Sequence, residues 1–167
     1  RTMDSLTHID SENFATMVNV GEKVVSARKA TARAVVEMPA EIFVLFSEKE
    51  YLSKKGPVIQ TAIIAGTMAV KKTAELIPLC HPLKIESCKF KVDFTRNQQL
   101  IIDCEVQTSE KTGVEMEALT GVSIAALTVY DMLKALSLDL KVSSVQLMAK
   151  SGGKRLFNRE APPEGVK

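Results

Sequence analysis

The fold is decided by a stretch that runs KIESCKFKVDF at residues 84–94, TRNQ at residues 95–98 and LIIDCEVQT at residues 100–108. The first and third segments contain β-branched and other apolar residues that alternate with polar ones, which is the pattern of half-buried strands. The polar segment between them has the composition of a turn. We therefore predict a β-hairpin in the middle of the chain.

Helices and further strands are predicted on both sides of this hairpin. Downstream, apolar residues recur at helical spacing over residues 115–138, and a last strand covers residues 142–148. Upstream, we predict a strand for residues 30–38, a short helix for residues 40–46 and a buried helix for residues 59–76. This order of elements predicts an α+β fold of the ferredoxin-like βαββαβ type, an antiparallel sheet with helices packed on one face.

Length and composition suit one globular domain. The chain has 167 residues, of which 46% are hydrophobic and 25% charged, enough for a core of its own. We assign residues 29–155 to a single catalytic domain, residues 1–28 to an N-terminal arm that lies over the domain or a neighbour, and residues 156–167 to a mobile C-terminal tail.

Charge and cysteine content exclude several classes of partner. The 22 basic and 20 acidic side chains are mixed along the chain and give a net charge of +2, so no overall field favours nucleic acid or an anionic membrane. No apolar run reaches the roughly 20 residues that span a bilayer, and we expect a cytoplasmic protein. We expect Cys80, Cys88 and Cys104 to be reduced thiols. We predict no metal-ligating residues: no zinc-type cysteine pair and no carboxylate cluster with clear metal geometry is present, and whether a divalent ion accompanies a bound ligand stays open.

The strongest chemical signal is the segment KTGVEME at residues 111–117, a turn that opens a helix with Glu115 and Glu117 in its first turn. The helix dipole alone stabilises such carboxylates by roughly 0.3–1 kcal/mol each, so a purely structural explanation stays open. Asp131 lies on the same helix face as Glu117, with Lys134 one turn further on, where an ordinary exposed ion pair is the alternative. Because about 21 Å of helix separates Glu117 from Asp131, both can act on one substrate only if it is long or if two subunits share the site.

A second candidate is the segment LCHP at residues 79–82. His81, held between prolines, is suited to act as an acid, a base or a ligand for a polar substrate, although a turn histidine bonded to backbone is the alternative. We expect its neighbour Cys80 to point to the opposite side and to pack in the core. Two cationic loops at residues 54–56 and 150–155 combine lysine with glycine as phosphate sites do, although such loops are commonly just solvated.

Together these motifs resemble the cyclic pyranopterin monophosphate synthase family, also called molybdenum cofactor biosynthesis protein C. The resemblance covers most of the chain, and two of its segments are long, ungapped and specific. It is carried by LTHI at 6–9, MVNV at 17–20, KG at 55–56, IPLCHPL at 77–83, KTGVEMEALT at 111–120, AALTVYDMLK at 125–134 and AKSGGK at 149–154.

This resemblance implies an activity, an assembly and a set of residues. The family converts 3′,8-cyclo-7,8-dihydroguanosine 5′-triphosphate into cyclic pyranopterin monophosphate and pyrophosphate, an early step of molybdenum cofactor (molybdopterin) biosynthesis, without a cofactor. It assembles as a homohexamer, a trimer of dimers with pockets at subunit interfaces. Matched positions imply that Asp131 is the catalytic acid or base and that Lys134 and Lys55 are its cationic companions. The substrate-binding residues implied are Leu79, Cys80, His81, Glu115, Met116, Glu117, Arg28 and Lys150.

The residue types agree with that chemistry. Ring rearrangement needs several proton transfers, and expulsion of pyrophosphate needs charge stabilisation on phosphate oxygens. We expect Lys134 to favour ionised Asp131, and we expect burial to lower the pKa values of the lysines.

Two other functions are compatible with the predicted fold. An RNA-binding module of the same topology would stack bases on sheet aromatics, yet the strand at residues 100–108 has none, and Tyr51 and Tyr130 lie outside the predicted strands. A catalytically silent, nucleotide-sensing or oligomeric module is the other rival. The combination of Asp131, Lys134, Lys55 and His81 argues against it.

Overall fold

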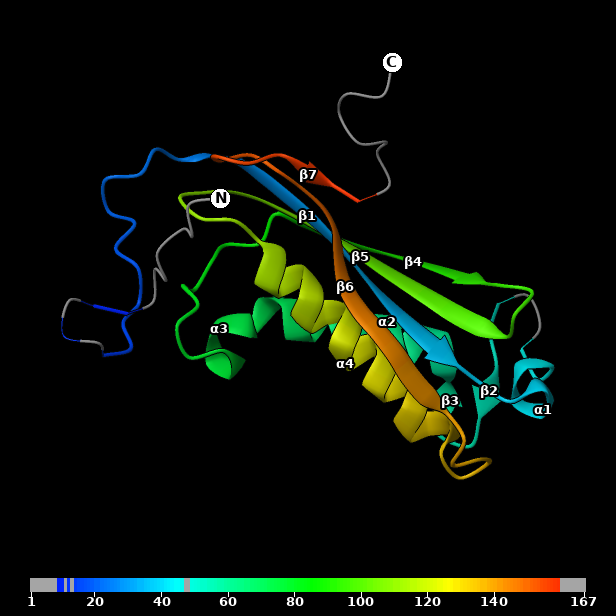
Figure 1. Ribbon diagram of the computed structural model, residues 1–167. Helices are drawn as coiled ribbons and strands as arrows, with labels where there is room; N and C mark the ends of the chain where they lie inside the picture. Colours follow the sequence, from blue (N-terminus) through cyan, green and yellow to red (C-terminus); the bar gives the residue numbers. More distant parts are fainter. Residues whose placement is uncertain (1–8, 11, 13, 47–48, 160–167) are drawn as a thin grey trace, which may run out of the picture.

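The protein consists of an antiparallel sheet covered on one face by helices, as Figure 1 shows. The computed structural model describes residues 9–10, 12, 14–46 and 49–159. In chain order the elements are β1 (Ser26–Glu37), α1 (Ala40–Phe43), β2 (Leu52–Ser53), β3 (Gly56–Pro57), α2 (Val58–Lys71), α3 (Thr73–Leu76), β4 (Ser87–Phe94), β5 (Gln99–Glu110), α4 (Glu115–Leu133), β6 (Lys141–Ser151) and β7 (Phe157–Asn158). The predicted α+β class is confirmed.

The main sheet has the strand order β4-β5-β1-β6-β7, and all its neighbouring strands are antiparallel. β4 and β5 form the predicted hairpin, in register from Ser87 opposite Gln107 to Phe94 opposite Leu100. β1 lies at the centre and pairs along its whole length with β5. β2 and β3 form a separate two-stranded hairpin.

Small residues allow the helices to pack closely on the sheet. The inward face of β1 carries three alanines and Val36, all buried. Gly66 of α2 and Gly121 of α4 face each other, because a Cβ atom built on Gly66 would lie 2.8 Å from the carbonyl oxygen of Gly121. A Cβ on Gly66 would also meet the Phe90 ring, and one on Gly121 would meet Val70, so glycine at these positions allows α2 and α4 to lie close together.

The outer face of the sheet is charged. The guanidinium of Arg33 contacts Asp103 at 2.7 Å, and Lys29 contacts Glu105 at 2.6 Å. The ring of Phe94 lies instead among the aromatic rings of the core, 5.1 Å from that of Phe46. Ion pairs therefore occupy the surface on which an RNA-binding module of this topology would present aromatic rings.

The longest helix, α4, is long and apolar enough to cross a membrane by its length and composition. However, it packs against α2 and three strands, and 56% of its most apolar 18-residue stretch is buried inside the protein. This burial is typical of a core helix.

Several predicted boundaries were wrong. The helix predicted at residues 59–76 is divided into α2 and α3, because Lys72 leaves the helical conformation with φ −105° and ψ 10°. The helix predicted to reach residue 138 ends at Leu133, and Leu138 is an exposed apolar residue beyond it. The first helix ends at Phe43 instead of residue 46, and β4 begins at Ser87 instead of residue 84.

The ends of the predicted domain also differ in detail. β1 begins at Ser26, so the last residues assigned to the arm already belong to the sheet. β6 runs to Ser151, through part of the predicted 150–155 loop, and Phe157 and Asn158 of the predicted tail pair with it as β7. Most of the segment LTHI lies outside the described residues, as do residues 160–167 of the tail.

Candidate active site

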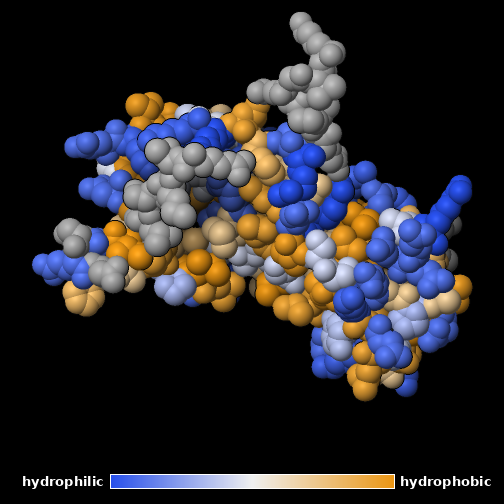
Figure 2. Space-filling view, viewed as in Figure 1, coloured by the Kyte–Doolittle hydropathy of each residue, from blue (hydrophilic) through white to orange (hydrophobic). Residues whose placement is uncertain are grey.

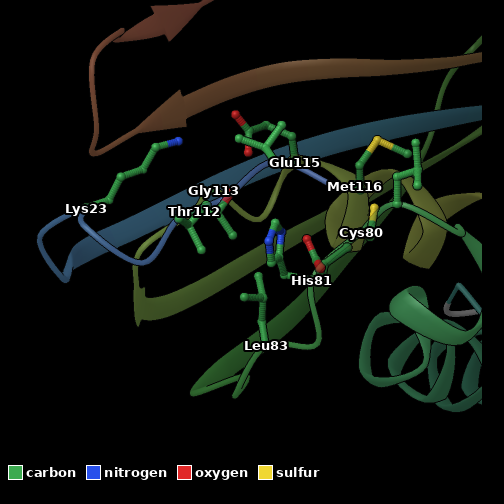
Figure 3. Close-up of a pocket in the computed structure, with 12 residues that line it drawn as sticks. Lys23, Cys80, His81, Leu83, Thr112, Gly113, Glu115 and Met116 are labelled. Carbon is green, nitrogen blue, oxygen red and sulfur yellow. The ribbon is translucent and has the colours of Figure 1, made fainter. Parts of the chain in front are cut away.

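A cavity of about 310 Å³ lies where the first turn of α4 meets the 79–83 loop and the N-terminal arm (Figure 3). Its lining combines apolar side chains with histidine, lysine and carboxylate side chains. The lining residues are Val18, Val20, Lys23, Leu79, Cys80, His81, Leu83, Thr112, Gly113, Glu115, Met116 and Glu117. Six of the eight predicted substrate-binding residues therefore line one cavity.

Glu117 has the most perturbed carboxyl of this cavity. Its side chain is buried, with 4% of the residue exposed. Burial raises its pKa to about 7; the neighbouring charge of Glu115 adds to this effect, and the backbone N–H of Glu117 itself opposes it. A carboxyl with this pKa can both hold and release a proton near neutral pH.

His81 and Cys80 both line the cavity, although they are adjacent in sequence. In Figure 3 the His81 ring lies between Thr112 and Cys80. The prediction that Cys80 packs in the core was wrong: its thiol is half-buried in the cavity wall. Burial, followed by the negative charge of Glu117, raises the pKa of the Cys80 thiol, so it remains protonated. The segment has no regular strand geometry, so its side chains need not alternate.

A cationic groove of about 890 Å³ adjoins this cavity. The cavity and the groove share Lys23, Thr112, Gly113 and Glu115. The other groove residues are Val24, Ser26, Arg28, Lys29, Lys111, Lys150, Ser151, Gly152, Gly153, Lys154 and Arg155. Seven of the groove's lining residues are lysine or arginine and one is a carboxylate, so the groove favours an anion.

Two glycines at the end of β6 shape the groove. Gly152 and Gly153 have φ values of +84° and +73°, which side-chain-bearing residues rarely adopt. Arg28 packs against this turn so closely that a Cβ atom on Gly153 would overlap its guanidinium. The same guanidinium donates hydrogen bonds to the carbonyl oxygens of Glu110 and Lys111, at 3.3 and 3.4 Å. Arg28 thus joins the glycine turn to the loop that leads into α4.

Lys150 reaches from the groove to the start of α4. Its ammonium contacts Glu115 at 2.6 Å, and both side chains are roughly 70% buried. The three predicted binding residues Arg28, Lys150 and Glu115 therefore meet in the groove.

Two lysines connect the arm to this region, and sequence patterns gave no signal for one of them, Lys23. Lys23 lies in the arm and lines both the cavity and the groove, and Lys111 donates a hydrogen bond of 2.6 Å to the carbonyl oxygen of Gly21. That bond holds the turn of the arm that precedes Lys23. Lys23 lies in a weakly periodic stretch, and within the arm the family resemblance marked only LTHI, MVNV and Arg28.

Asp131, Lys55 and Lys134 form a second cluster at the other end of α4. The Asp131 carboxylate accepts from the Lys55 ammonium at 2.8 Å and from the Lys134 ammonium at 2.7 Å. Lys134 and then Lys55 lower the pKa of Asp131 to about 2, so the carboxylate is ionised, as predicted. The prediction that burial lowers the pKa of Lys134 was wrong, since its side chain is more than half exposed and Asp131 raises that pKa.

The predicted site residues thus form two groups, and α4 separates them. Residues 117 and 131 are fourteen positions apart on this helix, or about 21 Å. Within residues 9–10, 12, 14–46 and 49–159, no group of three or more histidine, cysteine, aspartate or glutamate side chains is arranged to hold a metal ion. Cys80, Cys88 and Cys104 are free thiols, as predicted.

Comparison with known proteins connects this arrangement to one family. A family model described as the MoaC family matches residues 17–153. Cyclic pyranopterin monophosphate synthase of Xanthomonas campestris pv. campestris (strain 8004) is 51% identical over 154 residues, which cover 92% of this chain and 93% of that protein. The molybdenum cofactor biosynthesis bifunctional protein of Synechocystis is 49% identical over 89% of this chain and 44% of its own length. The molybdenum cofactor biosynthesis protein 1 of Drosophila melanogaster is 46% identical over 99% of this chain and 29% of its own length.

Proposed function

This chain belongs to the MoaC family, and we propose that it is a cyclic pyranopterin monophosphate synthase. It converts 3′,8-cyclo-7,8-dihydroguanosine 5′-triphosphate to cyclic pyranopterin monophosphate with release of pyrophosphate, an early step of molybdenum cofactor biosynthesis. The observation that carries the proposal is the continuity of the His81 and Glu117 cavity with the cationic groove. A substrate with a purine-derived ring and a triphosphate needs these two environments side by side.

The cavity suits the ring of the substrate. Its apolar walls exclude water from one side of a flat ring, while Glu117 and His81 provide groups for proton transfer. Cys80, Leu79 and Met116 contribute the wall against which the ring packs.

The groove suits the triphosphate. Forming the cyclic phosphate makes one bond from the α-phosphorus to a substrate hydroxyl and breaks its bond to the leaving pyrophosphate. Negative charge grows on the pyrophosphate oxygens as that bond breaks, and fixed cations such as Arg28 and Lys150 stabilise it.

Asp131, Lys55 and Lys134 act as the catalytic acid–base group from a second subunit. The length of α4 supports this part of the proposal, because it holds the group about 21 Å from Glu117 within one chain. In this arrangement one subunit binds the substrate, and a neighbouring subunit supplies the ionised Asp131 to it. We propose a homohexamer, a trimer of dimers with its pockets at subunit interfaces.

Apolar residues on the helix layer support self-association. Figure 2 shows hydrophobic residues at the surface over α3 and α4. Ile64, Met68 and Leu127, which lie on α2 and α4, are 61%, 49% and 56% exposed. Exposed apolar residues of this kind are typical of subunit interfaces.

The strand order and directions of β4, β5, β1 and β6 support a ferredoxin-like fold to which β7 and the β2–β3 hairpin are added. We propose a cytoplasmic enzyme that acts on a small nucleotide-derived substrate, with no nucleic acid or membrane partner.

The experiment is a pyrophosphate-release assay with the cyclised nucleotide. Asp131→Asn should abolish turnover and leave the fold intact. Asp93→Asn is the matched control, because Asp93 also lies between two lysines, at 3.0 Å from Lys49 and 2.8 Å from Lys91. Full activity of Asp131→Asn, or equal loss in both variants, would remove Asp131 from the mechanism.

Mixing two inactive variants tests whether the site is shared. In an equal mixture of Glu117→Ala and Asp131→Asn chains, half of the dimers contain one chain of each kind, and each such dimer has one intact site out of two. About a quarter of the wild-type activity should return. No recovery after subunit exchange would place the whole site within one chain.

A further inference from the structure

The β2–β3 hairpin carries Lys55 to the end of α4. Its strands have two residues each, and the backbone N–H of Val58 donates to the carbonyl oxygen of Tyr51 at 2.9 Å at its base. The Lys55 ammonium reaches Asp131 from the tip of this hairpin. Figure 1 shows the hairpin outside the main sheet, beside the C-terminal end of α4. A hairpin this short has little stability of its own. Its orientation therefore depends on the contacts that hold its base.

The Glu50 carboxylate fixes that base. One oxygen accepts hydrogen bonds of 2.9 Å from the backbone N–H groups of Tyr51 and Ile59, and the other accepts a bond of 3.0 Å from Gln60. Tyr51 enters the hairpin, whereas Ile59 and Gln60 lie in the first turn of α2, just after it. A single carboxylate therefore connects both ends of the hairpin.

The start of α2 needs such a partner. Its N-cap residue is Pro57, which makes no side-chain capping bond, so the first N–H groups of the helix lack an acceptor from that residue. A carboxylate at this position also interacts favourably with the positive end of the helix dipole. Glu50 lies outside the helix and supplies both the hydrogen-bond acceptors and the carboxylate for this end.

The tip of the hairpin is fixed in turn. The Ser53 hydroxyl accepts from the backbone N–H of Lys55 at 3.1 Å and donates to the carbonyl oxygen of Gly56 at 3.0 Å. Gly56 has φ +111°, a conformation that favours glycine. Hydrogen bonds thus run from Glu50 at the base to the backbone of Lys55 at the tip.

We propose that Glu50 is a positioning residue, which closes the base of the β2–β3 hairpin and thereby holds Lys55 against Asp131. This role of Glu50 rests on the proposed function in one respect only, the effect that a Glu50 substitution has on turnover. Lys55 lies about 10 Å from the base, at 3.3 Å per residue, so a rotation of about 6° at the base moves it by about 1 Å. A displacement of that size at a catalytic group can cost about 100-fold in rate, and the flexible lysine stem reduces this to between about 10- and 100-fold.

The decisive measurement is the pKa of Asp131. The pH dependence of its ¹³C carboxyl resonance in the full-length chain gives this pKa. Lys55 contributes to the low pKa of Asp131, together with Lys134. Lys55→Ala should raise that pKa, and Glu50→Ala should raise it in the same direction. The double variant should show little change beyond Lys55→Ala alone, because Glu50 acts through Lys55.

A control separates positioning from general loss of stability. Thr73→Ala removes buried hydrogen bonds of 3.1 Å to the carbonyl oxygens of Ala69 and Val70, far along α2 from the hairpin. It should lower the free energy of unfolding without changing the pKa of Asp131. If Glu50→Ala does not fold, Glu50→Gln, which retains one acceptor oxygen, and Ser53→Ala, which opens the tip, replace it.

The outcomes distinguish this proposal from the proposed function. An unchanged Asp131 pKa in the Glu50 variants, with a raised pKa in Lys55→Ala, would overturn the positioning role and leave Glu50 as a helix cap. A raised pKa accompanied by a 10- to 100-fold loss of pyrophosphate release would support both. If wild-type protein released no pyrophosphate, the proposed function would fail, and the titration would still decide the role of Glu50.

Discussion

Exchanging the buried Glu117 for glutamine should remove a pH dependence of stability from the protein. The carboxyl lies in the cavity wall with 4% of the residue exposed, and burial raises its pKa from 4.5 to about 7. Glutamine has nearly the same shape and carries no ionisable proton. The exchange therefore isolates the titration of one group.

The sign and size of the effect follow from proton linkage. Between pH 4.5 and 7 the folded protein keeps a proton on Glu117 that the unfolded chain releases, so this contribution to stability is complete below pH 4.5 and is lost as pH rises to about 7. At about 1.4 kcal/mol per pH unit, the loss amounts to about 3 kcal/mol. The stability of Glu117→Gln relative to wild type should therefore rise by about 3 kcal/mol over this interval.

Denaturant unfolding at several pH values and a fixed protein concentration measures this difference. The matched control is Glu75→Gln, since Glu75 is an exposed glutamate on α3 that lines neither the cavity nor the groove. Its stability should follow that of wild type at every pH. Parallel curves for Glu117→Gln and wild type would show that burial does not hold a proton on this carboxyl, and they would remove it from the proton-transfer scheme.

Three further substitutions test the groove and the helix packing. Gly153→Ala should reduce turnover at least tenfold at unchanged secondary structure, because its φ is +73° and its Cβ would overlap Arg28; wild-type rates would contradict this contact. Lys150→Met should weaken pyrophosphate binding about tenfold and reduce its salt dependence, which titration calorimetry at two salt concentrations checks. Gly66→Ala should cost about 1–3 kcal/mol in unfolding free energy, because the new Cβ meets the Phe90 ring and the carbonyl oxygen of Gly121; an unchanged denaturation midpoint would refute the close packing of α2 at this position.

The sequence predicted the elements whose periodicity is strong. The β4–β5 hairpin and the α4 helix follow directly from alternation and helical spacing, and the first turn of α4 lines the cavity. Their ends were less predictable. Leu136 continues the apolar spacing of α4 although the helix has ended, because hydrophobic periodicity does not report whether the chain still has a surface to pack against.

The candidate site was predictable in its residues but not in its connections. His81, Glu117 and Asp131 were marked by local segments, since each lies in a distinctive stretch of sequence. The contact between Lys150 and Glu115 joins residues 35 positions apart, and the bond from Lys111 to Gly21 spans 90. Only the antiparallel registers of β1, β5 and β6 bring such residues together, and spacing along the chain carries no record of register.

The length of α4 has a consequence for which insertions the chain can tolerate. Adding one residue near Gly121 would turn the Asp131 end by about 100° relative to the Glu117 end, and would carry Asp131 away from Lys55. Adding seven would nearly restore the rotation but displace Asp131 by about 10 Å along the axis. Loop connections accept changes in length readily, whereas this helix cannot gain or lose a residue without misaligning one end against the other. Among relatives that keep both ends functional, the interval from residue 117 to residue 131 should therefore have a fixed length, even where the surrounding loops differ.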